Sequence, residues 1–105
     1  MKPVQLSAAA ELDIAEAASY FEQQQEGLGV LFIRRVNEAV DKIAKTPLVY
    51  ATLIGDARRV MTRQFRYHVW YRVLADESIV IGCIHTSRDP QLAEERATRN
   101  PLLLD

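Results

Sequence analysis

The segment from Tyr67 to Thr86 reads YHVWYRVLADESIVIGCIHT and contains the two clearest β-strand patterns of the chain. Apolar, aromatic and β-branched residues fill 67–74 and 79–86, and the polar turn Ala-Asp-Glu-Ser at 75–78 separates them. Nearly every position of 79–86 is apolar, which predicts a central strand or a strand that is covered on both faces. The segment therefore predicts a hairpin of two antiparallel strands.

Two further segments have strand patterns. Residues 58–63 precede the hairpin and predict a third successive strand, although the connection 64–66 lacks the usual turn residues. Residues 4–6 predict a short strand at an edge of the sheet. Pro3 has no amide hydrogen to donate to a neighbouring strand, which disfavours a central position.

The chain between these strands carries apolar residues at helical spacing. One helix is predicted from Ala8 to about Gln25, with Ser7 as its N-cap residue, and a second helix is predicted to end at Lys45. Their apolar stripes consist of Ala10, Ile14, Ala17 and Phe21 in the first segment, and Phe32, Val36, Ala39, Val40 and Ile43 in the second. Glycines at 27 and 29 separate the segments, so the pattern predicts a helical hairpin.

The last predicted element is a short helix with Asp89 as its N-cap and Pro90 at its first helical position, ending at Arg99. The apolar tail 102–104 is expected to pack back on the domain or to meet a partner. The element order predicts one α+β domain over residues 1–105: an N-terminal edge strand, a helical hairpin packed on one face of a small antiparallel β-sheet, and a short C-terminal helix.

Composition narrows the class of protein. The chain has 105 residues, of which 49% are hydrophobic and 26% charged, as expected for one globular domain. No apolar run approaches the roughly 20 residues needed to cross a membrane. The first residues lack the apolar stretch of a secretory signal, and Cys83 is the only cysteine, so we expect a cytoplasmic protein without a disulfide. The two histidines and Cys83 have no metal-ligand spacing and no glycine-rich phosphate loop is present, so no metal and no cofactor is predicted.

Charge is distributed unevenly. The formal net charge is −1, yet five arginines and no carboxylate lie in residues 58–72. They are Arg58, Arg59, Arg63, Arg66 and Arg72, with Tyr67, Trp70 and Tyr71 among them. A guanidinium is permanently charged and its planar fork fits carboxylates and phosphates. We therefore expect these arginines on the open face of the sheet, as a docking surface for an anionic partner, either a protein or RNA.

Several short motifs occur in a recognisable order. They are Arg58-Arg59-Val60, then Tyr67 to Val73 with Tyr71-Arg72-Val73, then Ile79-Val80-Ile81, and finally His85 followed by Arg88-Asp89-Pro90. Ala9, Leu12, Ile14, Tyr20, Phe32 and Thr46-Pro47 fit the helical part of the same pattern. In this order, over residues 4–90, the chain resembles the ParE/RelE superfamily of bacterial toxins.

The resemblance implies the toxin of a type II toxin–antitoxin pair, neutralised by a cognate antitoxin, with no membrane involved. It implies two alternative mechanisms. ParE-like members bind and block DNA gyrase, whereas RelE-like members cut mRNA on the ribosome with basic residues and a tyrosine or histidine. The Arg88-Asp89-Pro90 motif followed by a further helix resembles the ParE branch, and Lys45 is the last lysine of the chain, unlike the RelE pattern. A superfamily member that has lost toxicity and only binds a partner is a third alternative, and a homodimer or a hetero-oligomer with the antitoxin is compatible with each.

Binding and catalysis assign different roles to the same residues. The residues predicted to bind the target or the antitoxin are Arg58, Arg59, Arg63, Arg66, Trp70, Arg72 and Arg88. RNA cleavage by a 2′-hydroxyl needs an acid, a base and positive charge, for which His85, Tyr71, Arg72 and Arg88 are the candidates, with His68 and Arg59 beside them. The alternative is that Tyr71 packs between sheet and helices and His85 bonds to the turn around Asp89. No catalytic set is firm, and we expect a binding protein rather than an enzyme.

Overall fold

The structure is a computed structural model and describes residues 1–98 of the chain. Within these residues, three helices flank a four-stranded sheet. In chain order the elements are β1 (Val4–Leu6), α1 (Ala8–Gln24), α2 (Leu28–Lys45), β2 (Arg58–Met61), β3 (Tyr67–Val73), β4 (Ser78–His85) and α3 (Pro90–Thr98). The predicted α+β class and the predicted element order are confirmed.

The sheet has the strand order β1-β4-β3-β2. The strands β2, β3 and β4 form the predicted antiparallel part. Strand β1 lies at the edge, as expected, and pairs with β4 in parallel from Val4 opposite Ser78 to Leu6 opposite Val80. The sheet is therefore mixed, and the N-terminus of the chain lies beside its last strand.

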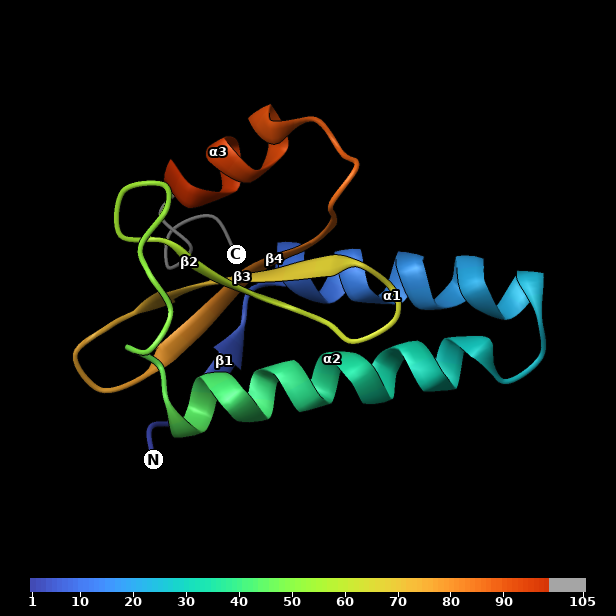
Figure 1. Cartoon of the computed structure of the whole chain (residues 1–105), viewed down its shortest axis with the longest axis horizontal. Helices are drawn as coiled ribbons and strands as arrows, with labels where there is room; N and C mark the ends of the chain where they lie inside the picture. Colours follow the sequence, from blue (N-terminus) through green and yellow to red (C-terminus); the bar gives the residue numbers. More distant parts are fainter. Residues whose placement is uncertain (99–105) are drawn as a thin grey trace.

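Helices α1 and α2 cover one face of the sheet (Figure 1). The side chains that fill this layer are buried, namely Phe32, Val36, Ala39 and Ile43 from α2, Ala10 and Ala17 from α1, and Val60, Val69, Tyr71, Val80 and Cys83 from the sheet. Ser7 caps α1 as predicted, since its Oγ accepts a hydrogen bond from the Ala10 amide at 3.1 Å. The helical hairpin and its stripes are thus confirmed as one side of the core.

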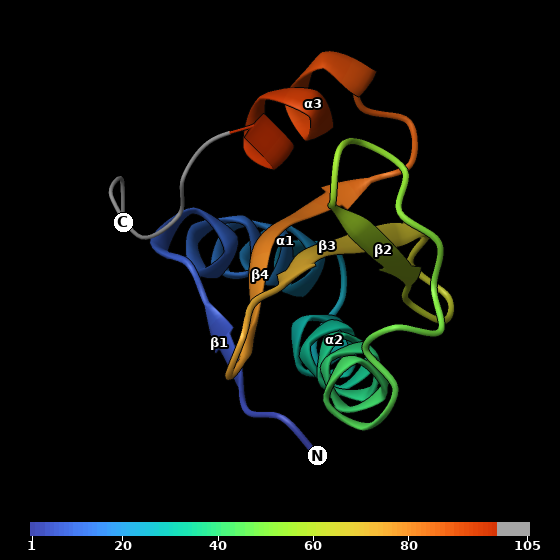
Figure 2. The same ribbon diagram turned by 90° about the vertical axis from the view of Figure 1, so that its left-hand side faces the viewer.

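Helix α3 covers the opposite face of the sheet (Figures 1 and 2). Ala93 and Ala97 of α3 pack on Trp70 and on isoleucines of β4 in a second buried cluster, which also includes Ala57. The expectation that the face opposite the helical hairpin is open is therefore wrong. The physical reason is that β4 carries apolar side chains on both faces, so both must be covered.

A β-bulge determines which side chains of β4 face each of the two helical layers. Tyr71 lies opposite Val80 and Trp70 lies opposite Gly82, so Ile81 is the extra residue. Strict alternation would send Ile81 and Cys83 to the same face. The bulge instead places Ile81 against α3 and Cys83 against the helical hairpin.

The turn between β2 and β3 has an unusual backbone. Gln64 and Arg66 have φ angles of 74° and 59°, in the left-handed region that non-glycine residues rarely adopt. Phe65 between them packs on Phe21 and Phe32 at ring-centroid distances of 4.8 and 5.2 Å. The packing of this partly buried ring stabilises a turn that the sequence does not mark with the usual turn residues.

Some expectations lie beyond the described part of the chain. The predicted end of the last helix at Arg99 and the role of the apolar tail 102–104 concern residues outside 1–98. Among residues 1–98, no helix combines the length and the apolarity needed to cross a membrane.

The helical hairpin depends on a close approach at Gly29. A Cβ atom at this position would lie 2.5 Å from the carbonyl oxygen of Ala18 in α1. We predict that Gly29→Ala destabilises the protein by roughly 1–3 kcal/mol, because the overlap with backbone outweighs the better helix propensity of alanine. Chemical denaturation measures this. Val30→Ala, at an exposed neighbouring position, is the control, and a Gly29→Ala variant as stable as wild type would contradict the packing.

Glu22 of α1 caps the beginning of α2. Its Oε2 accepts a hydrogen bond from the Gly27 amide and its Oε1 one from the Gly29 amide, both at 2.9 Å, while the N-cap residue Gly27 offers no side chain. These amide bonds lower the pKa of Glu22 below its usual value of 4.5. The carboxylate therefore links the two helices and prefers its charged form when the protein is folded.

This cap predicts a pH dependence of stability. A lowered folded-state pKa means that the contribution is fully present above pH 4.5 and is lost as the pH falls through the folded-state value. We expect Glu22→Gln to remove this part of the stability loss when unfolding is measured from pH 6 to pH 3. Glu26→Gln, in the same connection, is the control. An identical pH profile for wild type and Glu22→Gln would show that the cap contributes nothing.

Candidate functional site

The five arginines of residues 58–72 do not gather on one face of the sheet. Three of them are bonded within the protein to separate groups. Arg58 donates to the carbonyl oxygens of Tyr50 and Leu48. Arg63 Nε lies 3.1 Å from Glu38 of α2, and Arg72 makes two hydrogen bonds with Asp56, at 3.0 and 3.1 Å. The predicted open arginine surface is therefore wrong.

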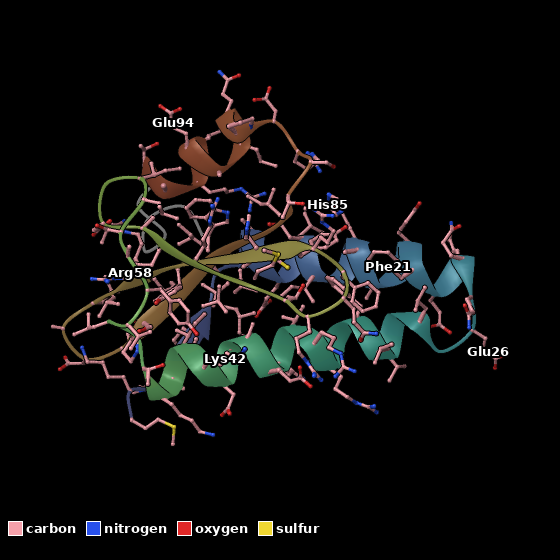
Figure 3. The ribbon with its side chains drawn as sticks, viewed as in Figure 1. Phe21, Glu26, Lys42, Arg58, His85 and Glu94 are labelled. Atoms are coloured by element: carbon pink, nitrogen blue, oxygen red, sulfur yellow. The ribbon has the colours of Figure 1, made fainter. Side chains whose placement is uncertain are left out.

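The reason for the scatter lies in the strand register. Arg58 shares the face of Tyr71 and Arg59 shares the face of Trp70, because these residues are opposite one another in β2 and β3. Arg66 is exposed in the turn before β3. Figure 3 shows Arg58 and His85 toward opposite ends of the sheet. The sequence cluster thus becomes several separate positions in space.

A cleft remains beside α3, and it combines charge with aromatic surface. It has a volume of about 210 Å³ and lies between α3, the ends of β3 and β4, and the segment that leads into β2. Its polar lining consists of Arg59, His68, His85, Thr86, Arg88 and Asp89, and its apolar lining of Leu53, Ile54, Trp70, Ile84, Pro90 and Ala93. Of the predicted binding residues, Arg59, Trp70 and Arg88 therefore meet in one place, together with the catalytic candidate His85.

Arg59 and Trp70 lie next to each other in the lining of the cleft. The guanidinium carbon of Arg59 lies 5.4 Å from the centre of the Trp70 ring, which is the geometry of a cation–π contact. Trp70 itself is only 4% exposed. It packs against Arg59 and has little surface of its own to offer a partner.

His68 lies next to Arg59 in the same cleft. Burial lowers the pKa of His68, and the charges of Arg59 and His85 lower it further. The imidazole of His68 is therefore kept neutral at physiological pH. A neutral imidazole accepts a proton or a hydrogen bond, and the cation beside it attracts an anion.

His85 is fixed by the chain that follows it. Its Nδ1 accepts a hydrogen bond from the Ser87 amide at 3.0 Å and lies 2.7 Å from the Ser87 hydroxyl. In the neutral ring the proton consequently resides on Nε2. These two contacts with Ser87 fix the orientation of the imidazole ring at the end of β4. The expectation that His85 bonds to the turn before α3 is confirmed.

Arg88 lies where the cleft meets a second hollow. This second hollow, also of about 210 Å³, is lined by Asp13, Glu16 and Tyr20 of α1 and by Tyr67, and it shares His85 and Arg88 with the cleft. Asp89 next to Arg88 caps α3, because its Oδ1 accepts a hydrogen bond from the Gln91 amide at 2.9 Å. We call these two hollows, which share lining residues at the end of β4, the groove.

Tyr71 is placed in the core. Its ring is fully buried between the sheet and the helical hairpin, and its hydroxyl donates to the carbonyl oxygen of Pro47 at 2.6 Å. Burial raises the pKa of Tyr71. The structure thus supports the packing interpretation of Tyr71, and it also leaves the catalytic candidate Arg72 in an ion pair with Asp56, away from His85.

Comparison with solved structures finds a likeness in fold. A chain in the solved structure described as "Chromosomal ParDE TA system from P. aeruginosa" superposes on this chain with a TM-score of 0.60 and 11% identity. The match covers 81% of this chain and 96% of the other. The two chains share a fold. That fold is the one implied by the sequence resemblance to the ParE/RelE superfamily.

Sequence comparison alone finds no relative. No family profile matches the sequence, and no curated protein matches it. The ParDE-like fold is thus recognised through geometry and through the short motifs, since 11% identity leaves few residues to compare. Among residues 1–98, no group of three or more metal-ligating side chains lies together.

The buried hydrogen bond of Tyr71 predicts that its hydroxyl contributes to stability and has no direct role in function. We predict that Tyr71→Phe lowers the free energy of unfolding by about 1 kcal/mol, because the Pro47 carbonyl loses its buried donor. The groove around β4 should be unchanged, so any binding or toxic activity should persist at temperatures where the variant is folded. Loss of activity in a stably folded Tyr71→Phe protein would instead assign the hydroxyl a direct role.

Proposed function

We propose that this protein is the toxin of a type II toxin–antitoxin pair of the ParE kind. It acts in the cytoplasm by binding a bacterial target, with DNA gyrase as the first target to test, and a cognate antitoxin neutralises it. The observation that supports this proposal most is the ParDE-like fold, which covers 96% of the compared chain. The motif order from Arg58 to Pro90 supports it independently.

The chemistry of the groove favours binding over catalysis. Tyr71 is buried, Arg72 is paired with Asp56, and Nδ1 of His85 accepts a hydrogen bond from the Ser87 amide. Arg59 and Arg88 provide positive charge on two walls of the cleft, and apolar side chains line the space between them. Such a surface binds an acidic segment of a protein, with affinity from the apolar contacts and orientation from the two guanidinium groups.

The target is tested with purified protein and with induced cells. We expect the protein to inhibit gyrase supercoiling in vitro, and its induction to cause a DNA-damage response. The double variant Arg59→Ala with Arg88→Ala should weaken inhibition by roughly tenfold or more, because both charges at the groove are lost. Arg34→Ala is the matched control, since Arg34 is an exposed arginine of α2 that lines neither hollow.

Two outcomes would contradict the proposal in different ways. Unaltered supercoiling together with cut ribosome-bound messages would replace gyrase binding by RelE-like cleavage. Normal growth under strong induction, with retained binding to an acidic antitoxin, would leave a partner-binding protein without toxicity.

A ribosome-dependent ribonuclease is the second candidate function, and the cleft supplies one observation in its favour. Neutral His68 lies beside Arg59, so a proton acceptor and a cation meet at one place. Under this alternative His68 takes the proton of the attacking 2′-hydroxyl and Arg59 stabilises the phosphorane. His68→Ala would then abolish mRNA cleavage and leave antitoxin binding intact, whereas the gyrase proposal expects no cleavage by the wild-type protein.

A further inference from the structure

The edge of β4 is only partly covered by β1. Their last paired residues are Leu6 and Val80, and the chain then turns into α1. Strand β4 continues to His85, so the main chain from Ile81 onward has no strand on that side. An uncovered strand edge exposes amide and carbonyl groups that pair readily with other chains.

Two charged side chains from distant helices occupy this edge. Asp13 of α1 accepts a hydrogen bond on its Oδ2 from the Cys83 amide at 3.0 Å. Arg96 of α3 donates from its Nη1 to the Ile81 carbonyl oxygen at 3.3 Å. Asp13 therefore accepts from an amide of the strand edge and Arg96 donates to a carbonyl oxygen of the same edge. A neighbouring strand would make the same two kinds of hydrogen bond.

Asp13 and Arg96 are also bonded to each other. Arg96 Nη1 lies 2.7 Å from Asp13 Oδ2, and Arg96 Nη2 lies 3.0 Å from Asp13 Oδ1. Their side chains are only 17% and 15% exposed, respectively. A partly buried pair is stable only when its geometry is good and its remaining bonds are made, and the two backbone bonds meet this requirement.

Gly82 makes room for the pair. A Cβ atom at this position would lie 3.3 Å from Arg96 Nη1 and 3.5 Å from Asp13 Oδ2. Gly82, which lies between Ile81 and Cys83, thus has no side chain that would crowd the ion pair. The arrangement links α1, β4 and α3 at a single place.

We propose that Asp13 and Arg96 are positioning residues that replace a neighbouring strand at the edge of β4 and thereby hold α3 over the cleft. Helix α3 and the residue before it provide Asp89, Pro90 and Ala93 to the wall of that cleft. The pair sets the position of this wall opposite Arg59 and His68. The proposal concerns the position of α3 and does not depend on which target the protein binds.

Amide hydrogen exchange at Cys83 tests the edge. In Asp13→Ala we expect the Cys83 amide to exchange about tenfold faster, because it loses a charge-assisted acceptor, while the central-strand amide of Val69 keeps its rate. Asp41→Ala is the matched control, since it removes an aspartate from the exposed ion pair with Lys45 in α2. Equal acceleration at Cys83 and Val69 would show a general loss of stability and would overturn the proposal.

A charge-swapped protein separates edge replacement from simple ion pairing. It combines Asp13→Arg with Arg96→Asp, which keeps opposite charges but places no acceptor on α1 for the Cys83 amide. We expect Cys83 to exchange as fast as in Asp13→Ala. Restoration of the wild-type rate would mean that only the attraction between the helices matters, and the proposal would be wrong.

The pKa of His68 provides a separate measure of the position of α3. Burial keeps the pKa of His68 low, with Arg59 and His85 as the charged and titratable groups that act on it. In Arg96→Ala, and also in the conservative Arg96→Lys that loses the planar fork, we expect an NMR titration to show the pKa of His68 rising toward its usual value as α3 loosens. An unchanged titration of His68 in a folded Arg96→Ala protein would overturn the role of the pair in holding α3.

Discussion

The burial of β4 on both faces is the constraint from which the rest of the structure follows. Seven of its eight residues are buried, so one layer of helices cannot complete the fold. The α1–α2 hairpin covers Val80 and Cys83, and α3 covers Ile79, Ile81 and Ile84. Because α3 and the second cluster cover the β4 side of the face opposite the hairpin, the exposed part of that face is confined to the β2 edge, where Arg59 and Met61 lie. The arginines of residues 58–72 instead occupy separate positions. Some bond to carbonyl groups, some pair with carboxylates, and Arg59 lines the groove.

This arrangement gives the groove its chemical character. Its walls come from separate parts of the chain: Arg59 from β2, His68 from β3, and His85 and Arg88 from the end of β4 and the connection to α3. Exposed ion pairs contribute only about 0–1 kcal/mol each, so Arg59 and Arg88 are suited to orient an acidic partner rather than to hold it alone. In the proposed complex, the apolar residues of the same groove supply the contact area. Trp70 packs against Arg59, and the Asp13–Arg96 pair holds α3. Both contacts limit the motion of the groove residues, which lowers the entropic cost of binding a partner.

Local patterns in the sequence were sufficient to predict the elements, and they failed where geometry depends on a single residue. Ser7, the helical stripes, the hairpin 67–86 and the Asp89 cap all follow local rules, and the structure confirms them. The bulge at Ile81 has no local signal, yet it moves every later side chain of β4 to the other face. The separation of Arg58 from Arg59 depends on strand register, and the pairing of Arg63 with Glu38 and of Arg72 with Asp56 depends on tertiary contacts. For the same reason, the contact between Asp13 and Arg96, 83 positions apart, could not be predicted.

Trp70 offers the most direct test that α3 covers the second face of the sheet. It is the single tryptophan of the chain, it is 4% exposed, and it packs in the cluster that contains Ala93 and Ala97. Acrylamide quenching of its fluorescence in the native protein measures its accessibility without a substitution. The account predicts a blue-shifted emission and quenching far weaker than that of the unfolded chain in denaturant. Quenching of native Trp70 as efficient as in the unfolded chain would show that the face is open and would contradict the arrangement on which the groove depends.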